Sequence, residues 1–500
     1  MTVTDFWLLF DTDFLYLAAH QGVTSVTSRR ALSVSVGLQI QKEKTITKQE
    51  ISMTNSTTRG SWGSRIGFIL AAAGSAVGLG AIWKFPYVAG ANGGGVFLLV
   101  YLACVFSVGV VMLLAEMMIG RTAKKSATSA YRALGKGYWH VAGWLSVLGV
   151  FLILGFYCVV GGWTIAYIVQ TIQGTVLTTD AKVLSDTFSH FIANPTASLI
   201  YTALFMIITA VIVIAGVQAG IERICKILMP ALFVLMLVMV WRSLTLPGAM
   251  EGVMYFITPD WSKLSIKMVL DALGLAVFSL SVGAGLMVAY GSYLSPETKV
   301  VNAGLWIAGL ATMASVLAGL MILPAVFAFD VDPAAGPGLT FITMPALFAQ
   351  MAGGQVLALI FFCLLLFAAV TSSISILEPV VAFLIDEYAM DRKLATILVA
   401  VVNYVILGIP AALSFGGGME SFTIFGKTPF DAMDFMASNV LMPLGGMFAA
   451  TFVGWRVWPQ IKAILAGEVP GAVQKVYWLL AAIVSPVLIA IVAVMTIKGS

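Results

Sequence analysis

Residues 59–101 read RGSWGSRIGFILAAAGSAVGLGAIWKFPYVAGANGGGVFLLVY. This segment is apolar and long enough to cross a bilayer, but GSAVGLG interrupts it at its middle, at residues 74–80. Backbone groups freed from helical hydrogen bonds are costly in hydrocarbon, and they persist there only when buried in protein or lining a cavity. We therefore predict that the interruption lies at a site for a bound solute.

The composition of the chain indicates that the bilayer is its solvent. Of 500 residues, 60% are hydrophobic and 10% are charged, against about 25% charged in an average soluble domain. Apolar runs of about 20 residues suffice to cross the hydrocarbon. The sequence predicts an all-α polytopic membrane protein with eleven transmembrane segments, near residues 64–90, 94–119, 140–172, 197–217, 225–246, 268–293, 301–328, 354–385, 394–415, 432–455 and 475–497.

The basic residues of the connecting loops give the orientation, because cytoplasmic loops carry an excess of Lys and Arg. With the first segment entering from the cytoplasm, fifteen such residues lie inside and six outside. The sequence therefore predicts a multi-pass membrane protein with a cytoplasmic N-terminus and an external C-terminus. The net charge of +4 reflects this loop bias, and no nucleic-acid partner is implied.

Catalytic and metal-binding motifs are not visible in the chain. Cys104, Cys158, Cys225 and Cys363 stand singly in or beside apolar segments, without paired spacing or a nearby ligand histidine, so we expect them to pack in the core. Nucleophile and phosphate-binding patterns after a strand are also missing. We do not expect an enzyme.

Residues 1–58 differ from the rest in being polar and unpatterned. The run FWLLFDTDFLYLAA is broken by acids and lacks a preceding basic region, which argues against a cleaved signal peptide. We expect a cytoplasmic N-terminal tail. Met53 is an alternative start, in which case residues 1–52 are not translated.

A second interruption occurs in the sixth segment, DALGLAVFSLSVGAGLMVAYGSYL, at residues 279–285. Segments one and six each lead a set of five, and interrupted segments at matching positions of two halves indicate an inverted-repeat transporter with a midplane site. The alternative is that these glycines only allow helices to pack closely. Packing alone does not explain the matched positions.

Several motifs then occur in a family order: GSAVGLG with KFP and NGGG, FSLSVGAG, VTSSISILEP and DAMDF. Over roughly residues 59–497 the chain resembles the neurotransmitter:sodium symporter family, particularly its prokaryotic amino-acid transporters with the leucine-transporter fold. The resemblance implies a 5+5 inverted repeat with discontinuous helices 1 and 6. It also implies a location in the plasma membrane, the inner membrane of a bacterium. It divides the chain into a first repeat at 59–246, a second at 247–456, and a peripheral last helix with the C-terminus at 457–500.

The resemblance also implies a site for a zwitterionic amino acid. Its carboxylate would meet backbone N–H groups at the start of the second half-helix, where the helix dipole favours an anion, and the hydroxyl of Tyr157. Its ammonium would meet carbonyl groups and the side chain of Ser281. The expected substrate residues are Ala76, Gly78, Leu79, Gly80, Ile153, Tyr157, Phe278, Ser279, Ser281, Ala284, Ser372 and Ile376. The family's monoamine transporters carry an acidic residue at the position of Gly78. The absence of an acid at this position indicates that the substrate is an amino acid.

Ala284 carries the expectation about substrate size. Relatives commonly place Phe or Met at this position, and the truncation opens about 60–100 Å³, which is of the order of an aromatic ring. We expect a bulky apolar or aromatic substrate. The alternative is that a neighbour such as Met287 refills the space.

The resemblance implies one sodium site made of oxygen ligands: Gly74, Val77, Ala368, Thr371 and Ser372. The alternative for the two hydroxyls is bonding back to their own helix. A second sodium site is doubtful, because Ala81 and Ala311 stand where the family has amide or acid ligands. Leu275 replaces a Gln, and Ala314 offers no charge for the anion site, which makes a chloride site doubtful as well.

Charged residues inside a bilayer are functional by default. By resemblance, Lys84 and Asp434 form an outer gate above Phe278, with Lys replacing the usual Arg and losing bidentate geometry. The expected inner gate consists of Arg59, Trp62, Tyr293 and Asp386, and Gly220 with Pro230 forms a hinge that permits local unwinding. Glu116 and Glu378 are expected to be structural acids that satisfy broken backbone.

Together these features predict a symporter that imports a neutral hydrophobic or aromatic amino acid by alternating access, driven by sodium at a single site. Two alternatives stay open. One is a sodium-independent exchanger or proton-coupled carrier, and the other is an amino-acid sensor that binds without transporting. The amino acid itself and the oligomeric state do not follow from the sequence.

Overall fold

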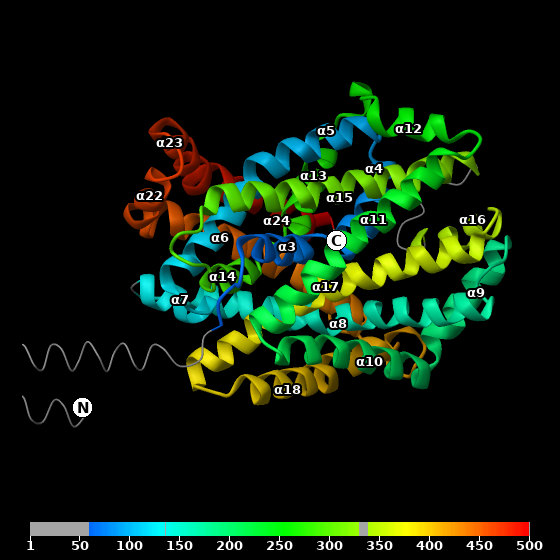
Figure 1. Ribbon diagram of the computed structural model, residues 1–500, viewed down its shortest axis with the longest axis horizontal. Helices are drawn as coiled ribbons and strands as arrows, with labels where there is room; N and C mark the ends of the chain where they lie inside the picture. The colour runs from blue at the N-terminus through cyan, green and yellow to red at the C-terminus, as the bar shows by residue number, and fades with distance from the viewer. Residues whose placement is uncertain (1–59, 136, 330–338, 500) are drawn as a thin grey trace, which may run out of the picture. The chain divides into compact units, whose positions relative to one another are not determined.

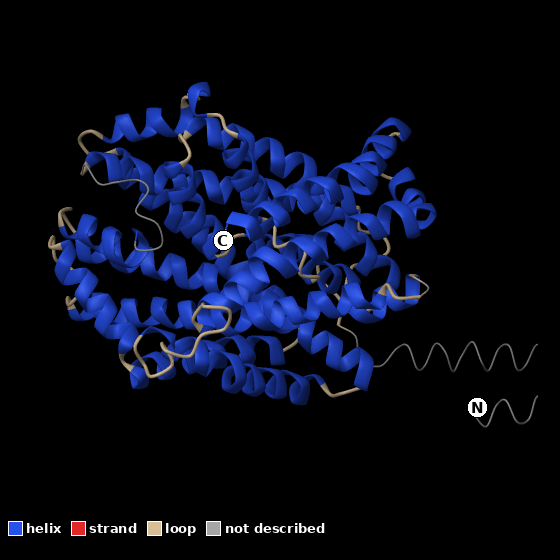
Figure 2. Cartoon of the chain, turned by 180° about the vertical axis from the view of Figure 1, so that it is seen from behind, coloured by secondary structure: helices blue, strands red, loops and turns tan. Residues whose placement is uncertain are grey.

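The computed structural model describes residues 60–135, 137–329 and 339–499. The regular elements in these ranges are helices (Figure 2), which confirms the predicted all-α fold for this part of the chain. Residues 1–58, with the alternative start at Met53, lie outside the described residues, and so does Arg59 of the expected inner gate.

Nine helical stretches in the described residues are long and apolar enough to cross a membrane, and a bent pair makes a tenth span. Their constituent elements are α5 (Gly95–Cys104), η2 (Val105–Gly109) and α6 (Val110–Ala123); α8 (His140–Gln173); α10 (Pro195–Ile214); η3 (Val217–Glu222) and α11 (Arg223–Leu244); α15 (Val300–Ala328); α17 (Gly354–Tyr388); α18 (Arg392–Asn403), η6 (Tyr404–Gly408), α19 (Ile409–Ala412) and η7 (Leu413–Phe415); α20 (Pro429–Asp434), η8 (Phe435–Leu441), α21 (Met442–Thr451) and η9 (Phe452–Arg456); α23 (Gly471–Leu479), η10 (Leu480–Val484) and α24 (Ser485–Gly499).

Both predicted interruptions are present. The first span consists of α3 (Arg65–Ala76), then η1 (Gly80–Lys84) and α4 (Phe85–Ala91), and its two parts meet at an angle of 52°. The sixth segment consists of α13 (Ile266–Ser279) and α14 (Leu286–Ser292). With these two, the described helices are consistent with the eleven predicted segments.

The break between α13 and α14 is shaped by three residues with positive φ. Ser281, Gly283 and Gly285 have φ values of 53°, 96° and 70°. Side chains strain such a conformation, so glycine is the favoured residue there. These three residues direct the backbone into a loop, and the N–H groups of that loop have no acceptors within a helix.

Glu116 of α6 satisfies that loop. Its carboxylate accepts hydrogen bonds from the N–H groups of Gly283 at 2.6 Å, Gly285 at 3.4 Å and Met287 at 3.1 Å. Its side chain is 1% exposed. The prediction that Glu116 satisfies broken backbone is confirmed.

The loops contain short helices that hydropathy did not predict. These are α7 (Ala127–Leu134), α9 (Ala181–Ala193), α12 (Ala249–Ile257), η4 (Trp261–Lys263), η5 (Leu339–Thr343), α16 (Met344–Ala349) and α22 (Trp458–Ala466). Figure 1 shows α7 and α22 at one end of the bundle and α9 and α16 at the other. They are too short to span the bilayer, so a search for apolar runs of about 20 residues passes over them.

The expected hinge is helical in this structure. Gly220 lies in η3, where a Cβ would overlap the carbonyl oxygen of Ile212, and Pro230 lies inside α11. Gly220 therefore allows the connection after α10 to fold back closely. Unwinding at this pair stays a prediction.

Replacing Glu116 with Ala is expected to leave buried N–H groups of the α13–α14 loop without acceptors. Each such group costs about 1–3 kcal/mol, so the thermal unfolding midpoint in detergent should fall by several degrees. Glu116→Gln keeps one carbonyl oxygen as an acceptor and should lose less stability. If the Ala variant has the same unfolding midpoint as the native chain, the loop does not depend on this carboxylate.

Candidate functional site

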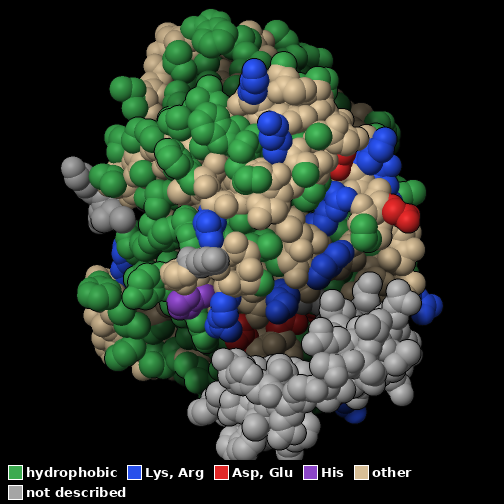
Figure 3. All heavy atoms as spheres, turned by 90° about the vertical axis from the view of Figure 1, so that its left-hand side faces the viewer, with side chains coloured by type: hydrophobic (Ala, Val, Ile, Leu, Met, Phe, Trp, Pro, Cys, Tyr) green, Lys and Arg blue, Asp and Glu red, His purple; other side chains and the backbone are tan. Residues whose placement is uncertain are grey.

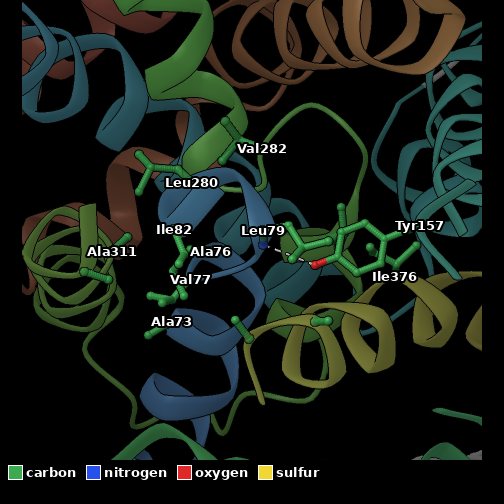
Figure 4. Packing of buried hydrophobic residues seen from close by; sticks show 14 of the residues in the cluster. Ala73, Ala76, Val77, Leu79, Ile82, Tyr157, Leu280, Val282, Ala311 and Ile376 are labelled. Atoms are coloured by element: carbon green, nitrogen blue, oxygen red, sulfur yellow. Dashed lines mark hydrogen bonds between the residues drawn. The ribbon is translucent and has the colours of Figure 1, made fainter. Parts of the chain in front are cut away.

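A cavity of about 60 Å³ lies where the two interrupted segments meet α8, α17 and α21. Figure 4 shows the end of α3 with Leu79 beside Tyr157 of α8, and Ile376 of α17 on the same side. The residues that line the cavity are Ser75, Ala76, Gly78, Leu79, Gly80, Ile153, Phe156, Tyr157, Phe278, Ser281, Leu286, Ser372, Ile376 and Met442.

One end of the cavity carries hydrogen-bond donors. The N–H of Leu79 donates to the hydroxyl of Tyr157 at 3.4 Å, a long bond at the start of the second half-helix. A Cβ at Gly78 would overlap Ser372 Oγ and lie 3.0 Å from Tyr157 Oη. Only glycine leaves this corner open. An acidic side chain at position 78, of the kind that pairs with an amine substrate, would not fit here without a shift of Ser372.

Serine hydroxyls tie the two breaks and α17 together on the other side of the cavity. Ser281 donates to the carbonyl oxygen of Ser75 at 2.8 Å, and Ser372 donates to the same oxygen at 3.1 Å. Ser375 donates to the Ser75 hydroxyl at 2.7 Å. Carbonyl and hydroxyl oxygens thus converge at the end of α3, and such a group can accept from an ammonium or coordinate a cation.

The expected sodium ligands lie at this same junction of α3 and α17. The Ser372 hydroxyl donates to the carbonyl oxygen of Gly74 at 3.2 Å. The Thr371 hydroxyl donates to the carbonyls of Phe367 at 3.0 Å and Ala368 at 3.1 Å in its own helix. A Cβ at Gly74 would lie 3.0 Å from Thr371 Cβ, so the two helices touch there. Val77 ends α3, and its N–H donates to Ala73.

Two expected substrate residues do not line the cavity. The Ser279 hydroxyl donates to the carbonyl of Leu275 and accepts from the Tyr101 hydroxyl at 2.9 Å. Ala284 is 1% exposed and lies in the turn between two positive-φ glycines. That turn brings Leu286 to the cavity wall instead, so the prediction that Ala284 sets the size of this cavity is wrong for this conformation.

The structure adds Ser75, Phe156, Leu286 and Met442 to the predicted lining. Phe156 directly precedes Tyr157, so its position next to a predicted lining residue could have indicated that it lines the cavity. Leu286 depends on the path of the loop, and Met442 comes from α21, which only the tertiary packing brings near. Met287 is buried and does not line the cavity. The alternative that it refills the space beside Ala284 stays a prediction.

The region of the doubtful second sodium site is mostly apolar. Ala81 and Ala311 are fully buried, and Leu275 is 4% exposed. A hydroxyl cluster lies beside them, however, in which Tyr101 contacts Ser279 and also Ser315 at 3.2 Å. Ser315, which directly follows Ala314 in the sequence, supplies a hydroxyl to this cluster and was not among the predicted residues.

The outer gate residues are separated in this structure. The ammonium group of Lys84 lies 5.1 Å from the ring centre of Phe278, and Asp434 accepts from Ser438 at 2.8 Å. Among the described residues, no ion pair within 4.0 Å joins Lys84 to Asp434. A groove of about 360 Å³ opens above Phe278 and is lined by Lys84.

The inner side is closed by a network that includes residues outside the prediction. The indole N–H of Trp62 donates to the carbonyl of Tyr290 at 3.0 Å, and its ring contacts that of Tyr293. Asp386 accepts from the N–H of Ser126.

Glu378 belongs to this network through side chains. It accepts from the Tyr293 hydroxyl at 2.6 Å and pairs with the guanidinium of Arg392. The prediction that Glu378 satisfies broken backbone is therefore wrong. The carboxylate is fully buried, and a buried charge requires a partner of opposite charge.

Comparisons with known proteins show the family of this chain. The model of the Sodium:neurotransmitter symporter family matches residues 59–187 and 180–499. An uncharacterized sodium-dependent transporter of Bacillus subtilis, YhdH, is 41% identical over 397 residues, which cover 79% of this chain and 88% of the relative. An uncharacterized sodium-dependent transporter of Haemophilus influenzae is 36% identical over 451 residues, covering 88% and 98%.

A solved structure is also similar. The crystal structure of MhsT in complex with L-phenylalanine has a TM-score of 0.80 and 44% sequence identity, and the match covers 87% of this chain and 99% of MhsT. By its sequence and its fold, the chain belongs to the sodium:neurotransmitter symporter family.

Proposed function

We propose that this member of the family imports a neutral hydrophobic or aromatic amino acid together with one sodium ion, by alternating access across the plasma membrane. The observation that carries the proposal is the junction of the α3 break with Tyr157 and Ser372. It supplies donors on one side of a small cavity and acceptors on the other. A zwitterion matches that polarity.

The substrate is oriented by this polarity. Its carboxylate lies against the N–H groups of Leu79 and Gly80 and the hydroxyl of Tyr157, where the half-helix dipole favours negative charge. Its ammonium lies against the hydroxyl of Ser281 and the carbonyls of Ala76 and Phe278, which line the cavity. Apolar residues of α8, α14, α17 and α21 then surround the side chain: Ile153, Phe156, Leu286, Ile376 and Met442. The phenylalanine in the MhsT structure supports a substrate of this class.

Sodium binds between α3 and α17. Gly74 and Val77 of the first span face Ala368, Thr371 and Ser372, and the contact of Ser372 with Gly74 supports this grouping. Hard cations prefer oxygen ligands of this kind. The methyl groups of Ala81 and Ala311 support a single site. One sodium gains about 2.3 kcal/mol from a potential of 100 mV, and a tenfold concentration gradient adds about 1.4 kcal/mol. The accumulation limit for a zwitterion is then about 500-fold.

Alternating access uses one barrier on each side of the cavity. Phe278, with Lys84 above it and Asp434 opposite, closes the outer path when the lysine pairs with the carboxylate. Trp62, Tyr293 and the Glu378–Arg392 pair close the inner path, together with Asp386. Lys and Arg side chains gather on the face shown in Figure 3, which supports a cytoplasmic position for that face.

Removing the hydroxyl of Tyr157 tests the position of the carboxylate. In Tyr157→Phe, affinity for phenylalanine should fall about 10- to 100-fold, the worth of a hydrogen bond to a charged group. Phenylalaninamide, which has no carboxylate, should lose much less in the same competition-binding assay. Tyr404→Phe is the control, because its hydroxyl donates to the carbonyl of Leu199 and the residue does not line the cavity. Equal losses for both ligands would place the carboxylate elsewhere.

Removing two hydroxyls tests the sodium site. Thr371→Val with Ser372→Ala leaves three carbonyls, too few to replace the hydration of the cation, so sodium-stimulated binding should disappear. The matched control is Ser373→Ala, whose hydroxyl faces Thr209 and Val370 rather than α3. In the native chain, stimulation should follow a Hill coefficient near one and need no chloride. A coefficient near two would contradict the single site.

The size of the pocket is tested at Leu286. Leu286→Ala removes three carbon atoms from the wall, so the affinity ratio of tryptophan to leucine should rise about tenfold. Met287→Ala is the control, because this neighbour is equally buried but does not line the cavity. A ratio that changes alike in both variants would show a general loss of packing.

A further inference from the structure

A second groove lies at the end of the molecule that carries α22 and α23 (Figure 1). Its volume is about 410 Å³, and its walls come from two adjacent helices. Trp458 and Lys462 of α22 face Gly471, Gln474, Lys475 and Trp478 of α23. The groove is remote from the substrate cavity and shares no lining residue with it.

The groove is positively charged and its charges are not compensated. Lys462 and Lys475 are both exposed. In the part of the chain that the structure describes, neither lysine has a carboxylate within 4.0 Å.

Glu468 is the acid of the connection between α22 and α23, and it is already engaged. It accepts from the N–H groups of Val300 and Val301, each at 2.7 Å, and lies 3.6 Å from Arg121. The two lysines are therefore available to an anionic ligand.

Aromatic side chains hold the walls of the groove rigid. The indole N–H of Trp478 donates to the carbonyl of Gly454 at 2.9 Å. The ring of Trp458 stacks on Tyr477, with centroids 6.3 Å apart and 19° between the planes. Tryptophan is enriched where the headgroups of a membrane begin.

The surface beside the groove is apolar. Val473, Val476, Leu479 and Ile483 follow one another along α23 and η10 and are each 43–56% exposed. These residues begin the last membrane span. A ligand whose anionic head occupies the groove can therefore extend apolar chains along this helix.

We propose that the groove binds the headgroup of an anionic phospholipid of the cytoplasmic leaflet. Lys462 and Lys475 hold the phosphate, the two tryptophans flank the glycerol backbone, and the exposed face of α23 contacts the acyl chains. Basic pockets between membrane helices on the cytoplasmic side bind such headgroups elsewhere. The continuity of the charged groove with a lipid-facing apolar surface selects a lipid over a free anion.

The test measures binding of one lipid to the purified full chain in detergent by native mass spectrometry. Phosphatidylglycerol is compared with phosphatidylcholine of the same acyl chains. Lys462→Gln with Lys475→Gln should weaken the binding of the first phosphatidylglycerol molecule about tenfold or more. The binding of phosphatidylcholine should not change. Lys462→Arg with Lys475→Arg should retain binding, since both charges remain.

The matched control is Lys125→Gln with Lys393→Gln, which removes two exposed charges outside the groove. It should bind phosphatidylglycerol like the native chain. Equal weakening in both double variants, or none in the groove variant, would overturn the proposal. Displacement of phosphatidylglycerol by inorganic phosphate at the same concentration would also overturn it, because the groove would then take a free anion.

Discussion

The structure depends on one constraint: a backbone N–H or C=O that leaves its helix inside hydrocarbon needs another partner. The chain breaks two of its apolar helical segments and meets the constraint differently at each. At the second break, the carboxylate of Glu116 accepts three N–H groups, so the loop is closed without a ligand. At the first break, the hydroxyl of Tyr157 accepts from the N–H of Leu79, and the hydroxyls of Ser281 and Ser372 donate to the carbonyl of Ser75. A cavity remains between these groups, with room for a solute.

Ser372 connects the two sites of the proposed mechanism. Ser372 lines the proposed substrate cavity, and its hydroxyl also donates to the carbonyl of Gly74, one of the proposed sodium ligands. An ion that coordinates the carbonyl oxygen of Gly74 must displace the hydrogen bond from the Ser372 hydroxyl. The hydroxyl then reorients at the wall of the substrate cavity. Coupling between the ion and the amino acid then needs no long path, because both act on the same end of α3 and the same turn of α17.

Much of the fold could be predicted because hydropathy and glycine act locally. The spans and both interruptions follow from runs of apolar residues and from GSAVGLG and FSLSVGAG. The residues that line the cavity were harder to predict from the sequence. Ala284 was predicted to line it, but the positive φ values at Gly283 and Gly285 send Leu286 there instead. Met442 reaches the cavity from α21, and Tyr101 contacts Ser315, which lies 214 positions away in the sequence. Glu378 pairs with Arg392 of the following helix. No local sequence pattern marks these contacts.

The most direct measurement of the central claim is uptake of a labelled amino acid into proteoliposomes under an imposed sodium gradient. The account predicts that phenylalanine or leucine accumulates above its external concentration while the gradient lasts, that a sodium ionophore releases it, and that excess unlabelled substrate inside exchanges with it. Exchange that ignores the sodium gradient, or binding to the purified protein without any uptake, would contradict the account.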